Sequence, residues 1–221
     1  MQENKFLVPF AIVVAGGLIA GAIYFGTGTS ATYVPGQSTT QTFKIAPVTE
    51  KDHYRGSRSA ELVIIEYSDT ECPWCKVFHN TMLEVLRSYG NRVAWVYRHV
   101  PYHSLAPKEA EATECAAELG GNQSFWNYVD KLFETTNSND SLDSAELPKI
   151  ALAIGLDLEA FNQCLSSGRH SELVKENLQD FIKFKMGTPY SVILTKDGTQ
   201  TIINGAEPLA TVKAKIDSLL K

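Results

Sequence analysis

Two residues separate Cys72 from Cys75, a spacing at which two thiols can interconvert between a dithiol and a disulfide. Cys72 comes where a predicted strand ends and a predicted helix begins. Unpaired backbone N–H groups and the helix dipole at such a terminus favour the thiolate, which is the attacking form of cysteine. We therefore expect Cys72 to be the nucleophile and the more buried Cys75 to resolve the mixed disulfide.

The two residues between the cysteines also bear on this chemistry. Pro73 suits the first helical turn, because its missing N–H has no helical partner there and its ring pre-sets the turn. Trp74 is large and mostly apolar, and it brings no positive charge to a thiolate. It can shield the thiols, present a surface to substrates, or simply pack in the core.

A Cys-x-x-Cys pair is also half of a zinc site, so metal binding is the alternative chemistry. The other two cysteines, Cys115 and Cys164, are single and far apart, and the histidines form no pair with ligand spacing. We expect surface or core roles for the histidines, which are His53, His79, His99, His103 and His170. The pattern favours redox chemistry, with no metal site and no cofactor.

The segments around the cysteine pair predict a strand, a helix and a parallel strand. Residues 62–65 and 93–97 are continuous apolar runs rich in β-branched and aromatic residues, as in strands covered on both faces. Between them, apolar residues recur at helical spacing over 78–89, and Gly90 can end that helix. This order indicates the β-α-β unit of a parallel sheet.

The rest of the domain predicts an α/β fold with a mixed sheet. Residues 107–186 contain successive amphipathic helical segments, an insertion of roughly 80 residues. Strand patterns return at 191–194 and 201–203, joined by a hairpin turn, and a last helix carries an apolar face over 209–219. We expect a small mixed sheet flanked by helices and interrupted by the insertion.

The N-terminal part, residues 1–25, predicts a membrane anchor. Residues 6–25 contain no charged side chain, and a helix of roughly 20 residues crosses a hydrocarbon core. A cleavable signal peptide is the alternative. Residues 26–42, rich in Gly, Ser, Thr and Gln, predict a flexible stalk before a folded domain at 43–221.

Charge and cysteine content limit the cellular location and the kinds of partner to expect. The 221 residues carry a formal net charge of −5 without a dense basic stripe, so nucleic acid is not an expected partner. Four cysteines in a chain that enters a membrane favour an oxidising compartment. We expect a single-pass protein of the cell membrane with its catalytic domain on the extracytoplasmic side.

The segment from Val63 to Cys75 resembles the active-site strand and helix of the DsbA-like thiol:disulfide oxidoreductases in the thioredoxin superfamily, of the membrane-anchored bacterial type. Gly187-Thr188-Pro189 is similar to the loop that carries a cis-proline facing the Cys-x-x-Cys in that family. The resemblance covers roughly residues 50–221 and implies a thioredoxin fold with a helical insertion. It also implies that the backbone of Thr188 lies exposed beside the sulfurs, where a substrate strand can pair.

The resemblance also bears on Glu66 and Trp74. Glu66, inside an apolar strand, matches the position of a buried acid in the family. Burial would raise the pKa of this carboxyl, which could then accept or deliver the proton that Cys75 exchanges. The alternative is a solvated glutamate at a sheet edge. Trp74 departs from the Cys-Pro-His-Cys of the best-known members, and losing a potentially cationic neighbour predicts a milder oxidant.

Cys115 and Cys164 each fall on the apolar face of a predicted insertion helix. Two buried free thiols are one interpretation. In an oxidising compartment we prefer a structural disulfide, which contributes roughly 4 kcal/mol in the chain-entropy model.

The function predicted is disulfide formation or exchange in exported proteins. The expected partners are reduced or unfolded exported substrates and, from the resemblance, a quinone-linked membrane protein that reoxidises the enzyme. A membrane-anchored thioredoxin-like reductase, as in cytochrome maturation, is the alternative within redox enzymes, and a metal-thiolate domain is the alternative outside them.

Overall fold

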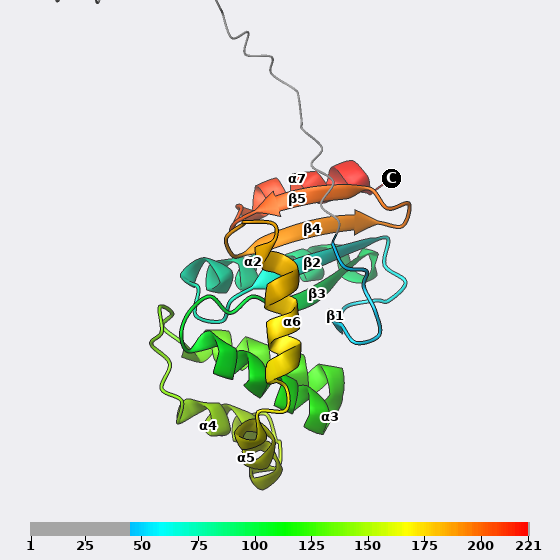
Figure 1. Ribbon diagram of the computed structural model, residues 1–221. Coiled ribbons are helices and arrows are strands. Elements are labelled where there is room, and N and C mark those ends of the chain that lie inside the picture. The colour runs from blue at the N-terminus through cyan, green and yellow to red at the C-terminus, as the bar shows by residue number, and fades with distance from the viewer. Residues whose placement is uncertain (1–44, 221) are drawn as a thin grey trace, which may run out of the picture. The chain divides into compact units, whose positions relative to one another are not determined.

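The computed structural model describes residues 45–220 (Figure 1). The expected membrane anchor and stalk lie outside these residues. Within residues 45–220, no helix is long and apolar enough to span a membrane.

Five strands form one mixed sheet. They are β1 (His53–Arg55), β2 (Leu62–Ser68), β3 (Val93–His99), β4 (Tyr190–Thr195) and β5 (Gln200–Asn204). Their order across the sheet is β1-β3-β2-β4-β5, with β2 and β3 parallel and the other neighbours antiparallel. The central strand β2 is apolar on both faces because helices cover both, which explains its continuous hydrophobic run.

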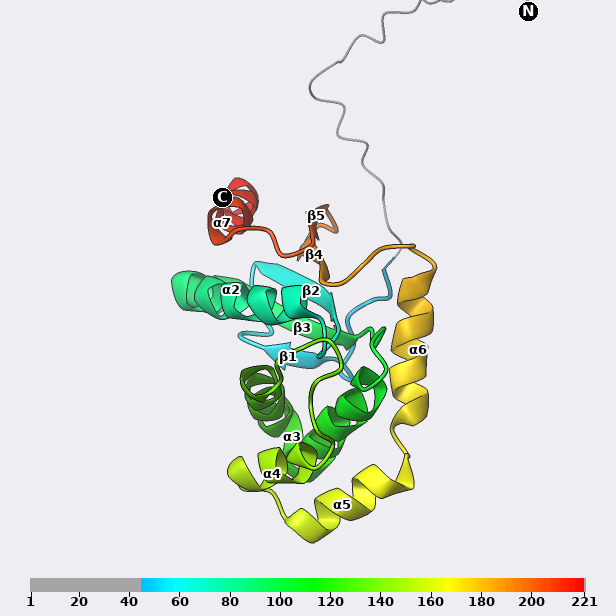
Figure 2. The same cartoon turned by 90° about the vertical axis from the view of Figure 1, so that its left-hand side faces the viewer.

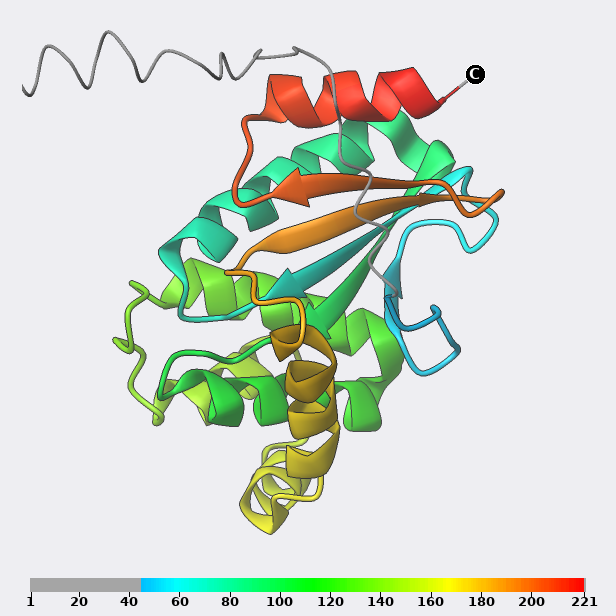
Figure 3. The ribbon, with the colours of Figure 1, turned by 45° about the horizontal axis from the view of Figure 1, so that its top comes forward.

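Helices cover the two faces of the sheet (Figure 2). On one face α2 (Pro73–Tyr89) packs beside α7 (Leu209–Leu219), as Figure 3 shows. On the other face lies α6 (Ser171–Ile182), whose Phe181 joins a separate core cluster with Ile65 and Val192. The predicted mixed sheet with flanking helices is confirmed.

The segment between β3 and β4 is a helical insertion, as predicted. It consists of α3 (Ala106–Thr135), α4 (Glu146–Ala153), α5 (Leu158–Ser167) and α6. A kink divides α3 at Gly121, whose φ of 72° is a backbone conformation that glycine adopts without strain. Helices α3, α4 and α5 enclose a core of their own, built around Tyr128, Leu147 and Phe161.

Candidate active site

The cysteine pair lies at the junction of β2 and α2. Cys72 is the N-cap residue of α2 with an extended backbone, and Pro73 begins the helix, where it loses no hydrogen bond. Both Cys72 and Cys75 are free thiols. The side chain of Cys75 is fully buried, whereas Cys72 keeps 6% of its surface exposed. An incoming sulfur can therefore reach Cys72 but not Cys75.

Several donors converge on the sulfur of Cys72. Hydrogen bonds from the Cys75 thiol, and from the backbone N–H groups of Cys75 and Trp74, lower the pKa of Cys72 from 9.0 to about 6 against the opposing effect of burial. A thiol with this pKa is mostly thiolate at neutral pH. Cys72 therefore has the charge state that a nucleophile and a good leaving group need.

Cys75 has the opposite electrostatic environment. Burial, followed by its interaction with Cys72 and the charge of Glu66, raises the pKa of Cys75 well above 9.0. The backbone N–H of Asp69 donates to its sulfur at 3.4 Å and partly offsets this. Cys75 therefore holds its proton when it is reduced.

The loop before β4 faces the first cysteine. The Thr188–Pro189 peptide bond is cis. The sulfur of Cys72 lies 3.5 Å from the backbone oxygen of Thr188. This contact brings together two segments that are more than 100 residues apart in the sequence.

Glu66 lies on the central strand, between Tyr97 of β3 and Ser191 of β4, and not at a sheet edge. Its carboxyl is fully buried, and neither oxygen has a hydrogen-bond partner among residues 45–220. Burial raises the pKa of Glu66 from 4.5 to about 8. The hydroxyl of Ser68 and the indole N–H of Trp95 moderate this rise, although neither forms a hydrogen bond with the carboxyl. Glu66 is therefore a protonated acid at neutral pH.

Trp74 does not pack in the core. Its side chain is 64% exposed at the first turn of α2, so the core-packing interpretation is wrong. Tyr102, on the loop after β3, is 47% exposed and donates its hydroxyl hydrogen to the backbone oxygen of Met186. Exposed aromatic surface is thus present both on the redox helix and on the loop that leads toward the insertion.

Sequence reasoning missed Asp69, the first residue after β2. Its buried carboxylate accepts hydrogen bonds from the backbone N–H groups of Glu71, Tyr102 and His103. The ring of His103 also contacts it at 3.0 Å. Asp69 therefore connects the loop that carries Cys72 to the loop after β3. A charged residue directly after an apolar strand is the only signal for this role in the sequence.

The next two residues join the same loop to the insertion. The hydroxyl of Thr70 donates to Glu109 of α3 at 2.5 Å, and the carboxylate of Glu71 accepts from the hydroxyl of Thr136 at 2.6 Å. Burial, with the nearby negative charge of Glu71, raises the pKa of Glu109 to about 8. These contacts hold the nucleophile's loop rigidly against the helical insertion.

The other two cysteines belong to the helical insertion. Cys115 of α3 and Cys164 of α5 form a disulfide with Cα atoms 5.8 Å apart. The ring of His170 lies near these two sulfurs, which are bonded to each other. His53 and His99, although distant in the sequence, both contact the carboxylate of Glu114, at 2.9 and 2.8 Å.

Residues 48–197 match the family described as thioredoxin. Among solved structures, DsbA2 of Pseudomonas aeruginosa is 26% identical with a TM-score of 0.64, over 79% of this chain and 97% of that one. Alpha-DsbA1 of Wolbachia pipientis is 22% identical with a TM-score of 0.68, over 78% and 92%. BdbD of Bacillus subtilis, in its oxidised form, is 21% identical with a TM-score of 0.65, over 76% and 92%.

The curated relatives with similar sequence are much longer proteins, and the matched segment is only a part of each. The Na⁺/H⁺ antiporter NhaA 1 of Mycolicibacterium vanbaalenii is 32% identical over 114 residues, and the antiporter NhaA 3 of Salinispora tropica is 35% identical over 132 residues. These matches cover 52% and 58% of this chain but only 18% and 19% of the antiporters. The similarity therefore concerns about a fifth of each antiporter.

Proposed function

Since the chain belongs to the thioredoxin family and is a DsbA-like thiol:disulfide oxidoreductase, we propose that it forms or exchanges disulfides in exported proteins through Cys72 and Cys75. The observation that carries this proposal is the contrast between the two thiols. Cys72 is partly accessible and readily ionised, whereas Cys75 is buried and holds its proton.

Disulfide donation begins with the oxidised enzyme. A substrate thiolate attacks the sulfur of Cys72, a mixed disulfide forms, and the bond between Cys72 and Cys75 breaks. Cys75 leaves as a thiolate and takes a proton from Glu66, which is buried and protonated at neutral pH. A second substrate thiolate then attacks the substrate sulfur of the mixed disulfide and releases Cys72. The substrate has lost two electrons, and the enzyme is now reduced, with Cys72 as a thiolate and Cys75 as a thiol.

The low pKa of Cys72 favours this direction. A stabilised thiolate stabilises the reduced enzyme, which makes the oxidised enzyme the stronger oxidant. Hydrogen bonds to the sulfur supply this stabilisation without a cationic residue at Trp74. The absence of a histidine at that position argues for an oxidant milder than proteins with Cys-Pro-His-Cys.

The surface around Cys72 suits unfolded polypeptide. Trp74 and Val77 expose 64% and 51% of their surfaces on α2. Tyr102 contributes exposed aromatic surface from the loop after β3, and the backbone of Thr188 lies 3.5 Å from the reactive sulfur. An extended substrate segment can pair with that backbone while its apolar side chains contact these residues.

The cellular setting is part of the same proposal. Residues 1–25 anchor the chain in the cell membrane, and the catalytic domain lies on the extracytoplasmic side. A quinone-linked membrane protein reoxidises Cys72 and Cys75. The supporting observations are the uncharged run at 6–25 and the disulfide between Cys115 and Cys164, which an oxidising compartment preserves.

The alternative redox function is a membrane-anchored reductase. The long insertion of α3 to α6 favours the DsbA-like oxidant, because a thioredoxin-like reductase would carry a much shorter one. A metal-thiolate domain is disfavoured by the contact between Cys72 and Thr188, since the loop occupies the space beside the sulfur.

The equilibrium reduction potential tests the proposal. The full chain, with Cys115→Ser/Cys164→Ser to isolate the redox pair, is equilibrated in glutathione buffers, and the chain with all four cysteines serves as the control for folding. We expect a potential above that of the glutathione couple. A potential near about −270 mV, that of thioredoxin, would overturn disulfide donation in favour of a reductase.

A further inference from the structure

A row of polar side chains crosses the sheet beside Cys75. Ser191 of β4, Glu66 of β2, Tyr97 of β3 and His53 of β1 are direct partners in consecutive strand pairs. Side chains of directly paired residues point to the same face of a sheet. The row therefore runs from the buried acid at the centre of the sheet to its β1 edge.

The inner part of the row contains buried polar atoms that lack partners. Both carboxyl oxygens of Glu66, and the hydroxyls of Ser68, Tyr97 and Ser191, have no hydrogen-bond partner among residues 45–220. Folded proteins rarely leave such groups unsatisfied, and buried water commonly satisfies them. Ser68 lies close enough to Glu66 and Tyr97 to lower the pKa of each, although it forms no hydrogen bond with either. Bridging water can satisfy buried polar groups in such an arrangement.

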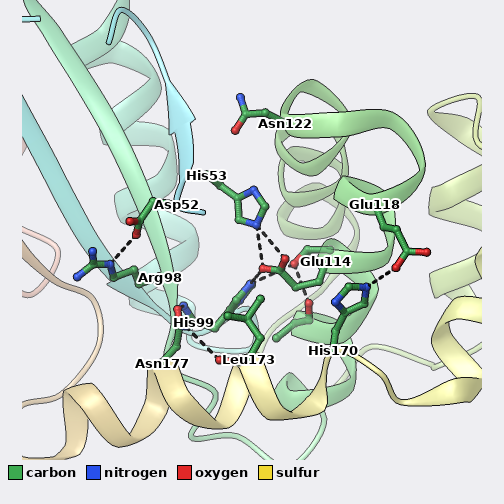
Figure 4. A network of polar contacts seen from close by, with 12 residues as sticks. Asp52, His53, Arg98, His99, Glu114, Glu118, Asn122, His170, Leu173 and Asn177 are labelled. Atoms are coloured by element: carbon green, nitrogen blue, oxygen red, sulfur yellow. Dashed lines mark hydrogen bonds and ion pairs between the residues drawn. The ribbon is translucent and has the colours of Figure 1, made fainter. Parts of the chain in front are cut away.

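The outer part of the row opens on a pocket. Tyr97 borders this pocket of about 180 Å³ together with His53, His99 and Glu114. The two histidine rings converge on the carboxylate of Glu114 from β1 and β3 (Figure 4). The ring of His99 lies edge-on to Tyr97 with centroids 5.3 Å apart. Tyr97 thus adjoins both the buried cluster around Glu66 and the pocket.

Charged groups keep the pocket polar. Arg98 and Asp52 form an ion pair at 2.8 Å on its wall, and Asp180 of α6 also borders it. The side chain of His53 is 15% exposed, so the cluster reaches solvent. A polar, roomy pocket with several partners is the kind of site that holds ordered water.

We propose that this row is the path by which protons pass between the Cys75–Glu66 pair and solvent, with the hydroxyl of Tyr97 as the relay between buried water and the pocket. The inference rests on the proposed function. During disulfide donation, Glu66 gives its proton to Cys75 and regains one through Tyr97. During reoxidation, the proton that Cys75 loses moves outward along the same groups.

The chemistry of Tyr97 suits a relay that does not ionise. Burial, with the charges of Glu66 and Cys75, raises the pKa of Tyr97 well above 10.0. Its hydroxyl can accept a proton on one side while it releases its own on the other, so no phenolate forms. On the side of the thiols, Cys75 is fully buried and Cys72 nearly so, which leaves Glu66 little direct access to solvent.

Hydrogen–deuterium exchange of the Glu66 carboxyl tests this path. The reduced full chain at about pH 6, below the pKa of about 8 of both Glu66 and Glu109, is mixed rapidly with D₂O. Infrared spectroscopy then follows the C=O stretching bands of the two protonated carboxyls. The variants Glu66→Gln and Glu109→Gln assign these bands.

Tyr97→Phe keeps the ring and removes the relay hydroxyl. We expect the Glu66 band to exchange at least about tenfold more slowly, while the Glu109 band, outside the row, exchanges as in the unmodified chain. Tyr54→Phe removes a hydroxyl from the opposite face of the sheet and should leave both rates unchanged. An unchanged Glu66 rate in Tyr97→Phe, or equal slowing of both bands, would overturn the path.

His53→Phe provides a second variant at the sheet edge. It retains an aromatic ring to stack on Phe125 and removes both ring nitrogens from the pocket. We expect slower exchange of the Glu66 band here too, and an unaltered rate would contradict a role for the β1 edge. Failure of the proposed function is separately visible, because the unmodified chain would then not exchange disulfides in glutathione buffers at all.

Discussion

The two cysteine pairs of this protein consist of the same side chains but lie in opposite surroundings. Cys72 and Cys75 lie at the first turn of a helix, where donors aim at one sulfur. Cys115 and Cys164 lie within α3 and α5, fully enclosed by a core that includes Phe161, and are bonded to each other. Neither of these two cysteines exposes more than 1% of its surface.

This difference teaches that position in the fold separates a reactive pair from a structural one. Thiolate character and access control the exchange of a disulfide, and the insertion core denies both to Cys115 and Cys164. The first pair has an accessible sulfur at Cys72 and an acid, Glu66, next to its partner. Changes at each pair should therefore have separable effects on activity and on stability.

Replacing the accessible sulfur should have the largest effect. Cys72→Ser removes the nucleophile, so the rate at which the chain oxidises a dithiol peptide should fall at least about a thousandfold. Peptide oxidation followed by mass spectrometry measures this rate. The matched control is Cys115→Ser/Cys164→Ser. Substantial turnover by Cys72→Ser would show that the reaction does not depend on the pair Cys72 and Cys75.

Removing the insertion disulfide should instead affect stability. Cys115→Ser/Cys164→Ser releases a constraint across 49 residues, and the free energy of unfolding should fall by about 4 kcal/mol in the chain-entropy model. Urea denaturation of the full chain measures the loss. The reduction potential of Cys72 and Cys75 should stay the same, and a shift in it would show that the two pairs are coupled.

Substituting the buried acid should change how stability depends on pH. The pKa of Glu66 is about 8 in the folded chain and near 4.5 when exposed, because burial disfavours the carboxylate. The folded state therefore binds this proton more tightly, and stability falls as pH rises from 4.5 towards 8, by up to about 1.4 kcal/mol for each pH unit.

Glu66→Gln should lack this part of the decline and should be more stable than the unmodified chain at pH 8. Urea midpoints at pH 5 and pH 8 measure the difference between the two chains. Glu134→Gln, at a side chain that is 66% exposed, is the control for a surface carboxylate. Parallel pH profiles for Glu66→Gln and the unmodified chain would mean that Glu66 does not hold its proton in the folded state.

A substitution at Trp74, between the two reactive cysteines, should have the smallest effect of these changes. Trp74→His places a potentially cationic ring at the exposed first turn of α2, so the pKa of Cys72 should fall below about 6 and the oxidised form should become a stronger oxidant. A tenfold change in the equilibrium constant corresponds to about 30 mV. The pH dependence of alkylation by iodoacetamide measures the pKa, and an unchanged midpoint would show that position 74 does not influence the thiolate.

Much of the framework was predictable because it follows from local patterns. The apolar runs at 62–65 and 93–97 correspond to β2 and β3, and the periodic segment at 209–219 corresponds to α7. The three-residue strand β1 was missed, because so short a segment contains no alternation that periodicity can detect. Strand β2 extends beyond the apolar run to Ser68 and contains Glu66, as the sequence predicted.

What the sequence determined by itself is the chemistry available at the end of β2: two thiols one helical turn apart, a proline that begins the helix, and an acid six residues before the first thiol. Only the tertiary structure decided the charge states and the connections. It buried Glu66 between β3 and β4, brought Thr188 to the sulfur of Cys72, and joined His53 and His99 at one carboxylate. Burial and long-range contact depend on how distant segments pack, and no local pattern encodes them.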